Sequence, residues 1–131
     1  MRILIAEDDF TNRLLLQELL KSYGPCHVAV NGKEGVDAAL LARDAGEPYD
    51  LICLDIMMPE MDGQEALRKI RDNEEARGVI STKGATIIMT TALGDVKSVN
   101  AAFNSLCDGY LTKPISQEKL VEELRKLKLI P

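Results

Sequence analysis

Acidic side chains gather at two places where an apolar run of the chain ends. Glu7, Asp8 and Asp9 follow the first run, and Asp55 follows the run 51–54. Carboxylates that share a partly dry cleft repel one another, and a divalent cation relieves that repulsion. Because the available ligands are all oxygens, the pattern favours a hard ion such as Mg²⁺.

A hydroxyl and an ammonium group follow two further apolar runs. Thr90 and Thr91 end one of them, and Lys113, followed by Pro114, ends the other. A cation, a lysine and a hydroxyl around one carboxylate make a phosphoryl-transfer site. Asp55 is the expected nucleophile because it ends the central apolar strand. Lys113 and Thr91 are then expected to hold the phosphoryl oxygens that the cation leaves free.

Each of these signals is ordinary when it is taken alone. Asp8 or Asp9 could cap a helix, a carboxylate often ends a strand for structural reasons, and paired threonines suit a strand. The argument for a site depends on the placement of all these residues at one edge of one fold.

The elements that would place them there alternate along the chain. Apolar runs predict five strands, and residues with helical periodicity predict a helix after each strand. This order predicts an α/β fold with a doubly wound, five-stranded parallel sheet, in which all strands end at the same edge. The strands are expected at 2–6, 26–30, 51–54, 86–90 and 109–112, and the helices at 11–23, 33–45, 63–76, 95–106 and 117–128.

Length, charge and hydropathy argue against several classes of protein. The 131 residues fit a single domain, 1–131, and the net charge of −5 with no long basic cluster argues against direct binding to nucleic acid. No apolar stretch approaches the ~20 residues that cross a membrane, and the N-terminus becomes acidic too early for a signal peptide. Three scattered cysteines are expected to be reduced and mostly buried, so the expected location is cytoplasmic.

Four motifs, in this order, resemble those of the receiver domains of two-component response regulators, as in the single-domain chemotaxis receivers. The resemblance covers residues 2 to about 128 and implies a flavodoxin-like sheet with strand order 2-1-3-4-5. The motifs are ILIAEDD at 3–9, LDIMMPEMDG at 54–63, MTTA at 89–92 and GYLTKP at 109–114.

The resemblance also implies a role for individual residues of the acidic cluster. Asp55 matches the aspartate that accepts the phosphoryl group. Glu7 and Asp8 match the acidic pair that holds Mg²⁺ together with Asp55, and Met57 matches the position whose backbone carbonyl completes the metal site. Arg13, five residues past Asp8, supports this alignment.

The remaining matches concern signalling. Thr91 matches the hydroxyl that moves toward the phosphoryl group, Lys113 the lysine of the site, expected before a cis proline, and Tyr110 the aromatic switch residue. The implied donor is a histidine on a sensor kinase or on a histidine phosphotransfer protein. The implied response is a changed surface over residues 95–128, read by a downstream protein, in a monomer or a phosphorylation-dependent dimer.

Other functions remain open at this point. The chain could be a receiver-like module that binds partners without phosphate. It could also be a small Mg²⁺-dependent aspartyl-phosphate phosphatase, but those enzymes usually carry a second aspartate two residues after the nucleophile, where this chain has Met57. A flavin-binding domain is disfavoured because Glu7, Asp8 and Asp9 would repel phosphate. A receiver would catalyse only its own phosphorylation and dephosphorylation, and Met1 directly before the first strand favours a stand-alone protein.

Overall fold

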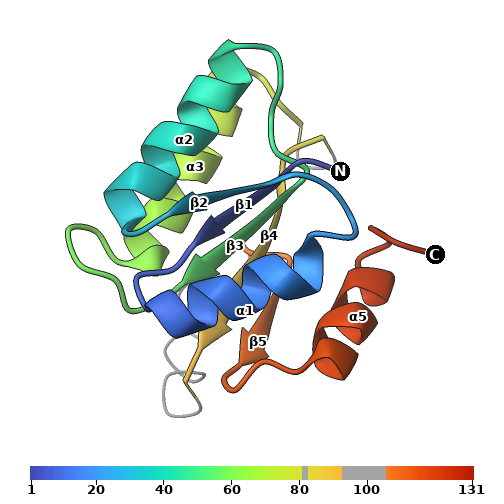
Figure 1. Ribbon diagram of the computed structural model, residues 1–131. Helices are drawn as coiled ribbons and strands as arrows, with labels where there is room; N and C mark the ends of the chain where they lie inside the picture. Colours follow the sequence, from blue (N-terminus) through green and yellow to red (C-terminus); the bar gives the residue numbers. More distant parts are fainter. Residues whose placement is uncertain (81–82, 93–105) are drawn as a thin grey trace.

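The computed structural model describes residues 1–80, 83–92 and 106–131 of the chain. These residues form one parallel sheet of five strands in the order β2-β1-β3-β4-β5, with four helices around it (Figure 1). The predicted α/β fold and its strand order are therefore confirmed. The elements are β1 (Ile3–Ala6), α1 (Phe10–Leu20), β2 (Cys26–Ala29), α2 (Gly32–Asp44), β3 (Leu51–Asp55), α3 (Gly63–Ala76), β4 (Thr86–Thr91), β5 (Gly109–Thr112) and α5 (Gln117–Lys126).

The central strand β3 is buried along its whole length, as its continuous apolar run predicted. It pairs with β1 on one side and with β4 on the other, and both pairings are parallel. The register sets Asp55 opposite Thr90 and Thr91 opposite Thr112. The last residues of β3, β4 and β5 are thus neighbours at one edge of the sheet.

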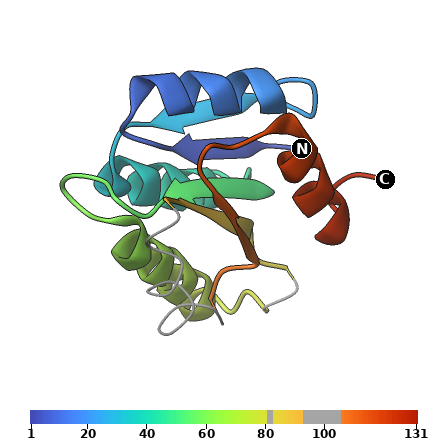
Figure 2. The same ribbon diagram turned by 90° about the horizontal axis from the view of Figure 1, so that it is seen from below.

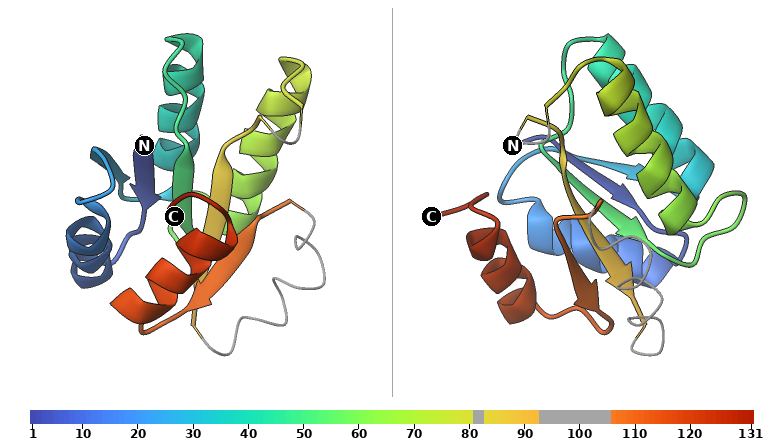
Figure 3. Two further views of the ribbon diagram at one scale, coloured as in Figure 1. Left: turned by 90° about the vertical axis from the view of Figure 1, so that its right-hand side faces the viewer. Right: turned by 180° about the vertical axis from the view of Figure 1, so that it is seen from behind.

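The helices cover both faces of the sheet. Figures 2 and 3 show α2 and α3 on one face and α1 and α5 on the other. Side chains that alternate along each strand pack into two separate clusters, as expected for a strand with covered faces. One cluster contains Leu4, Ala6, Ile52, Leu54, Ile87 and Met89 with residues of α2 and α3, and the other contains Ile3, Ile5, Leu51, Cys53, Ile88 and Leu111 with residues of α1 and α5.

Side-chain caps fix where the helices begin. Asp9 accepts a hydrogen bond from the Asn12 amide at 2.9 Å and caps α1, and Ser116 caps α5. Helix α1 ends at Leu20, earlier than predicted, because residues 21–23 form a turn before the Gly-Pro pair. Strands β3 and β4 each continue one residue further than predicted, because Asp55 pairs with Thr90 and Thr91 pairs with Thr112.

Two predictions remain to be placed. The helix expected at 95–106 lies almost entirely outside the described residues. The three cysteines are free, with Cys53 and Cys107 buried and Cys26 partly buried. Burial raises the pKa of Cys53 to about 12, so this thiol is inert packing in the core.

Candidate functional site

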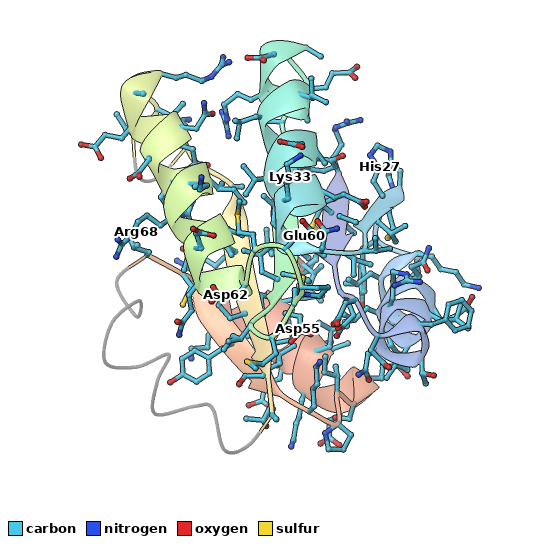
Figure 4. All side chains as sticks on the ribbon, turned by 90° about the vertical axis from the view of Figure 1, so that its left-hand side faces the viewer. His27, Lys33, Asp55, Glu60, Asp62 and Arg68 are labelled. Atoms are coloured by element: carbon cyan, nitrogen blue, oxygen red, sulfur yellow. The ribbon has the colours of Figure 1, made fainter. Side chains whose placement is uncertain are left out.

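The acidic residues that end β1 and β3 meet at the carboxyl edge of the sheet. Glu7 is fully buried, Asp55 is 4% exposed, and Asp8 lies on the surface beside them. One carboxylate oxygen from each of these three residues lies within 4.8 Å of the others. The structure therefore brings together the three carboxylates predicted to hold a metal. Figure 4 shows Asp55 close to the loop that leads from β3 to α3.

Lys113, which directly follows the edge strand β5, also reaches this cluster. Its Nζ lies 2.9 Å from Glu7 Oε1 and 3.2 Å from Asp55 Oδ1. Because β4 separates β5 from β3, the lysine side chain has to cross the end of β4 to reach both carboxylates. The Lys113 amide donates a hydrogen bond to the Thr91 carbonyl at 2.7 Å, and the peptide bond from Lys113 to Pro114 is cis, as predicted.

One ammonium cannot fully compensate two buried carboxylates, and the pKa values of the pair diverge. For Asp55, burial is the largest effect, and the hydrogen bond and charge of Glu7 add to it, so that its pKa rises to about 7. Burial also raises the pKa of Glu7, but hydrogen bonds from Asp55 and Lys113 outweigh it and leave the pKa below its usual value. A buried acidic pair that keeps a proton near neutral pH, beside a third and exposed carboxylate, fits a site for a divalent cation.

The acidic turn after β1 is held by its neighbours in the chain. Arg13 donates a hydrogen bond from Nη1 to the Glu7 carbonyl at 2.9 Å and a longer one to the Asp8 carbonyl at 3.5 Å. Asp9 caps α1 and is not part of the cluster of Glu7, Asp8 and Asp55. Arg13 and Asp9 thus fix the backbone from which Glu7 and Asp8 project.

The loop between β3 and α3 is fixed by a close backbone approach. A Cβ atom on Gly63 would lie 2.1 Å from the Asp55 carbonyl oxygen, so only glycine fits at the start of α3. The Gly63 amide also donates to the Ile56 carbonyl at 2.8 Å, and Asp62 caps the helix. In this loop Met57 is 66% exposed, which suits a residue expected to act through its backbone carbonyl, although that role stays a prediction.

Thr91 and Tyr110 lie on the same face of neighbouring strands. Tyr110 pairs with Met89, two residues before Thr91, and packs partly buried against the cluster under α2 and α3. Thr91 is buried, and its hydroxyl donates to the Ala92 carbonyl at 3.0 Å. The two predicted switch residues therefore share one face of neighbouring strands, and the Thr91 hydroxyl is bonded to the residue that directly follows β4.

Sequence reasoning gave no role to Thr90 or to a second set of charged residues. Thr90 is buried opposite Asp55, and the register alone would have placed it there. At the opposite edge of the sheet, Glu74 is 6% exposed and pairs with Arg71 at 2.7 Å and Arg43 at 3.4 Å. Only the three-residue spacing of Arg71 and Glu74 hinted at this ion pair.

Comparison with known proteins agrees with this geometry. Residues 3–125 match the family model of the response regulator receiver domain. The chain is 36% identical over 129 residues to the two-component response regulator ORR41 of Oryza sativa, covering 98% of this chain and 95% of that protein. It is 35% identical to the sensor histidine kinase GacS of Pseudomonas protegens over 95% of its own length, but it spans only 13% of that kinase.

Solved structures show the same fold. The receiver domain of the Saccharomyces cerevisiae response regulator Ssk1, crystallised with the histidine phosphotransfer protein Ypd1, superposes with a TM-score of 0.80 at 29% identity, covering 96% of this chain and 87% of that one. The receiver domain of the sensor histidine kinase PA1611 from Pseudomonas aeruginosa has a magnesium ion coordinated in its active-site cleft. It superposes with a TM-score of 0.75 at 28% identity, covering 95% and 94% of the two chains.

A parallel sheet with paired carboxylates and a lysine at its carboxyl edge defines a class of signalling domains. The chain belongs to the response regulator receiver domain family of two-component systems. Within the part of the chain that the structure describes, no helix is long and apolar enough to span a membrane.

Proposed function

We propose that this chain accepts a phosphoryl group on Asp55 from a phosphohistidine of a sensor kinase or of a histidine phosphotransfer protein. The observation that carries the proposal is the contact of one ammonium, that of Lys113, with two buried carboxylates beside the exposed Asp8. The solved complex of the Ssk1 receiver with Ypd1 supports this class of donor. We propose that residues 1–131 act as a single receiver unit and catalyse only their own phosphorylation and dephosphorylation.

The transfer exchanges one bond to phosphorus for another. An Asp55 carboxylate oxygen forms the new P–O bond, the P–N bond to the donor imidazole breaks, and the imidazole nitrogen takes up a proton. Asp55 must be ionised to act as the nucleophile, and the nearby Lys113 ammonium favours that form. Hydrolysis of the acyl phosphate by water later restores the carboxylate.

Glu7, Asp8 and Asp55, with the Met57 carbonyl, are the groups that would hold Mg²⁺ in this site. The bound ion supplies charge neutralisation for the phosphoryl oxygens. Glu7 is buried and pairs with Lys113, so it holds the lysine near Asp55. Asp8 is exposed and therefore marks the side from which ion and donor enter.

The response is proposed to pass through Thr91 and Tyr110. To reach a phosphoryl group on Asp55, the Thr91 hydroxyl has to leave the Ala92 carbonyl. Its departure makes room on the face where Tyr110 packs, and Tyr110 lies on β5 beside α5. A downstream protein would read the altered β5–α5 surface, and a phosphorylation-dependent dimer is an alternative use of the same surface.

Apolar side chains beside the site suit a donor that is itself a protein. Phe10, the first residue of α1, and Met57, two residues past β3, are each 66% exposed. Both follow strand ends at the edge that carries Asp55 and Asp8. Exposed apolar groups around a reactive centre are typical of protein docking surfaces.

Phosphorylation by acetyl phosphate tests the proposal directly. We expect intact-mass spectrometry to detect one added phosphoryl group in the presence of Mg²⁺ and none in excess EDTA or in an Asp55→Asn variant. Transfer from a phosphorylated histidine phosphotransfer domain should depend on the same residue. Failure of the wild-type protein to gain mass under both conditions would refute the proposal and favour a phosphate-independent interaction module. Continuous release of phosphate from unrelated phosphoesters would favour a phosphatase.

A further inference from the structure

We infer that Thr90 is a positioning residue of the phosphorylation site, whose hydroxyl accepts a hydrogen bond from the Lys113 ammonium in the working state. The inference rests on the proposed function of Asp55. It starts from one buried oxygen: Thr90 is 1% exposed, and its Oγ1 has no hydrogen-bond partner among the described residues. Buried hydroxyls are nearly always paired, so an unpaired one at the edge of a reactive site needs an explanation.

The sheet register places this hydroxyl on the face that carries the site. Thr90 pairs with Asp55 of β3 and with Leu111 of β5. Paired residues of adjacent parallel strands project from the same face, and Leu111 and Ile88 both pack in the cluster under α1 and α5. Thr90 therefore projects from the sheet face that bears Asp55, whereas Thr91, the next residue, projects from the other.

The path of Lys113 brings its ammonium across this position. Lys113 follows β5, and its Nζ lies 3.2 Å from Asp55 on β3, so its side chain spans the end of the intervening β4. Thr90 is the residue of β4 that pairs with Asp55 on this face. The lysine side chain therefore crosses the end of β4 on the sheet face that carries Thr90.

The Lys113 ammonium has an N–H group available, and the Thr90 hydroxyl oxygen has no partner in the part of the chain that the structure describes. An ammonium carries three N–H groups, and ion pairs with Glu7 and Asp55 leave at least one of them for a third partner. When Asp55 carries a phosphoryl group, Lys113 loses its contact with a free carboxylate there. A neutral acceptor below the ammonium then keeps the lysine over the site without competing for its charge.

A valine at position 90 tests this role, since valine keeps the shape of threonine and removes the hydroxyl. We expect Thr90→Val to unfold at the same or a higher urea concentration than the wild type, because the lost hydroxyl has no partner in the unmodified protein. Its phosphorylation by acetyl phosphate with Mg²⁺ should be slower by about three- to tenfold, the effect of one lost hydrogen bond in the transition state. Thr90→Ser should restore the rate.

Two further measurements separate positioning from packing. Thr86→Val makes the same change at the start of the same strand, at the far edge of the sheet, and should phosphorylate at the wild-type rate. In protein labelled with ¹⁵N-lysine and bound to Mg²⁺ and beryllofluoride, the Lys113 Nζ signal should shift in Thr90→Val and return in Thr90→Ser.

Several results would overturn the inference. A Thr90→Val variant that phosphorylates as fast as the wild type would show that the hydroxyl is idle. Equal slowing in Thr90→Ser, which keeps the hydroxyl, would show that the effect comes from disturbed packing at this position and not from the lost hydroxyl. A clear loss of stability in Thr90→Val would show that the hydroxyl already has a partner. If the wild type itself is not phosphorylated, the proposed function fails and this inference falls with it, an outcome that the wild-type control identifies.

Discussion

Replacing Asp55 with asparagine should stabilise the metal-free protein, although it removes the expected phosphorylation site. Asp55 and Glu7 are both buried and share the ammonium of Lys113. The structure thus holds two carboxyl groups near one cation, and burial with the neighbouring acid raises the pKa of Asp55 from 3.8 to about 7. An asparagine keeps the size of the side chain and has no charge to bury.

The size of the effect follows from the pKa shift. Above pH 7 the folded protein must hold Asp55 ionised at a site that favours its protonated form. A rise of about three pKa units corresponds to about 4 kcal/mol of unfolding free energy, an upper bound because Glu7 and Asp55 share one proton and Glu7 shifts in the opposite direction. We expect Asp55→Asn to gain roughly 1–4 kcal/mol at pH 8.

The dependence on pH gives the sign a separate check. Between about pH 4 and pH 7 the folded state binds more protons at Asp55 than the unfolded state does, so the stability that this group contributes falls as the pH rises through that window. The stability gap between Asp55→Asn and wild type should therefore be small at pH 5 and largest above pH 7.

Urea unfolding in EDTA at pH 5, 6, 7 and 8 measures the gap, and Asp8→Asn is the matched control. Asp8 belongs to the same cluster but is exposed, so its replacement should change stability much less. Addition of Mg²⁺ should stabilise the wild type and narrow its distance from Asp55→Asn. An Asp55→Asn variant that is less stable than wild type in EDTA at pH 8 would refute the account of the buried acidic pair.

Two further predictions concern the two groups of buried charges. The affinity for Mg²⁺ should fall by up to about tenfold for each pH unit below 7, because Asp55 must lose its proton before the ion binds. NMR titrations with Mg²⁺ at pH 6 and pH 8 measure this affinity, and equal values would contradict the prediction. Glu74→Ala should lose about 3–5 kcal/mol of unfolding free energy, because it leaves Arg43 and Arg71 without their buried partner. Glu75→Ala, on the exposed side of α3, should change the unfolding free energy little. Urea unfolding measures both variants, and a similar loss in each would contradict the argument.

The parallel sheet and the acidic cluster could be predicted from local patterns, whereas the strand order was predicted from the family resemblance. A continuous apolar run at 51–54 marked the central strand, and carboxylates after two such runs had to meet at the carboxyl edge of a parallel sheet. The alternation of strands and helices predicted covered faces. The switch roles of Thr91 and Tyr110 and the metal-binding role of the Met57 carbonyl came from the family resemblance, and they remain proposals.

Contacts between distant parts of the chain could not be predicted in the same way. That Lys113 reaches both Glu7 and Asp55 depends on the crossing of β4, which only the three-dimensional sheet reveals. The unpaired hydroxyl of Thr90 depends on which neighbours fail to reach it. Sequence patterns indicate which face a residue occupies, but they do not give the distances between side chains on different strands.

Buried acidic side chains have different partners at the two edges of the sheet, and the difference indicates which edge serves stability and which serves function. At the amino edge, Glu74 accepts from Arg71, from Arg43 and from the Ala85 amide, so its charge is matched by two cations and a backbone donor. At the carboxyl edge, Glu7 and Asp55 share one ammonium. A divalent cation can supply the positive charge that is missing around Asp55, and we therefore expect the proposed response to phosphorylation to begin at that edge.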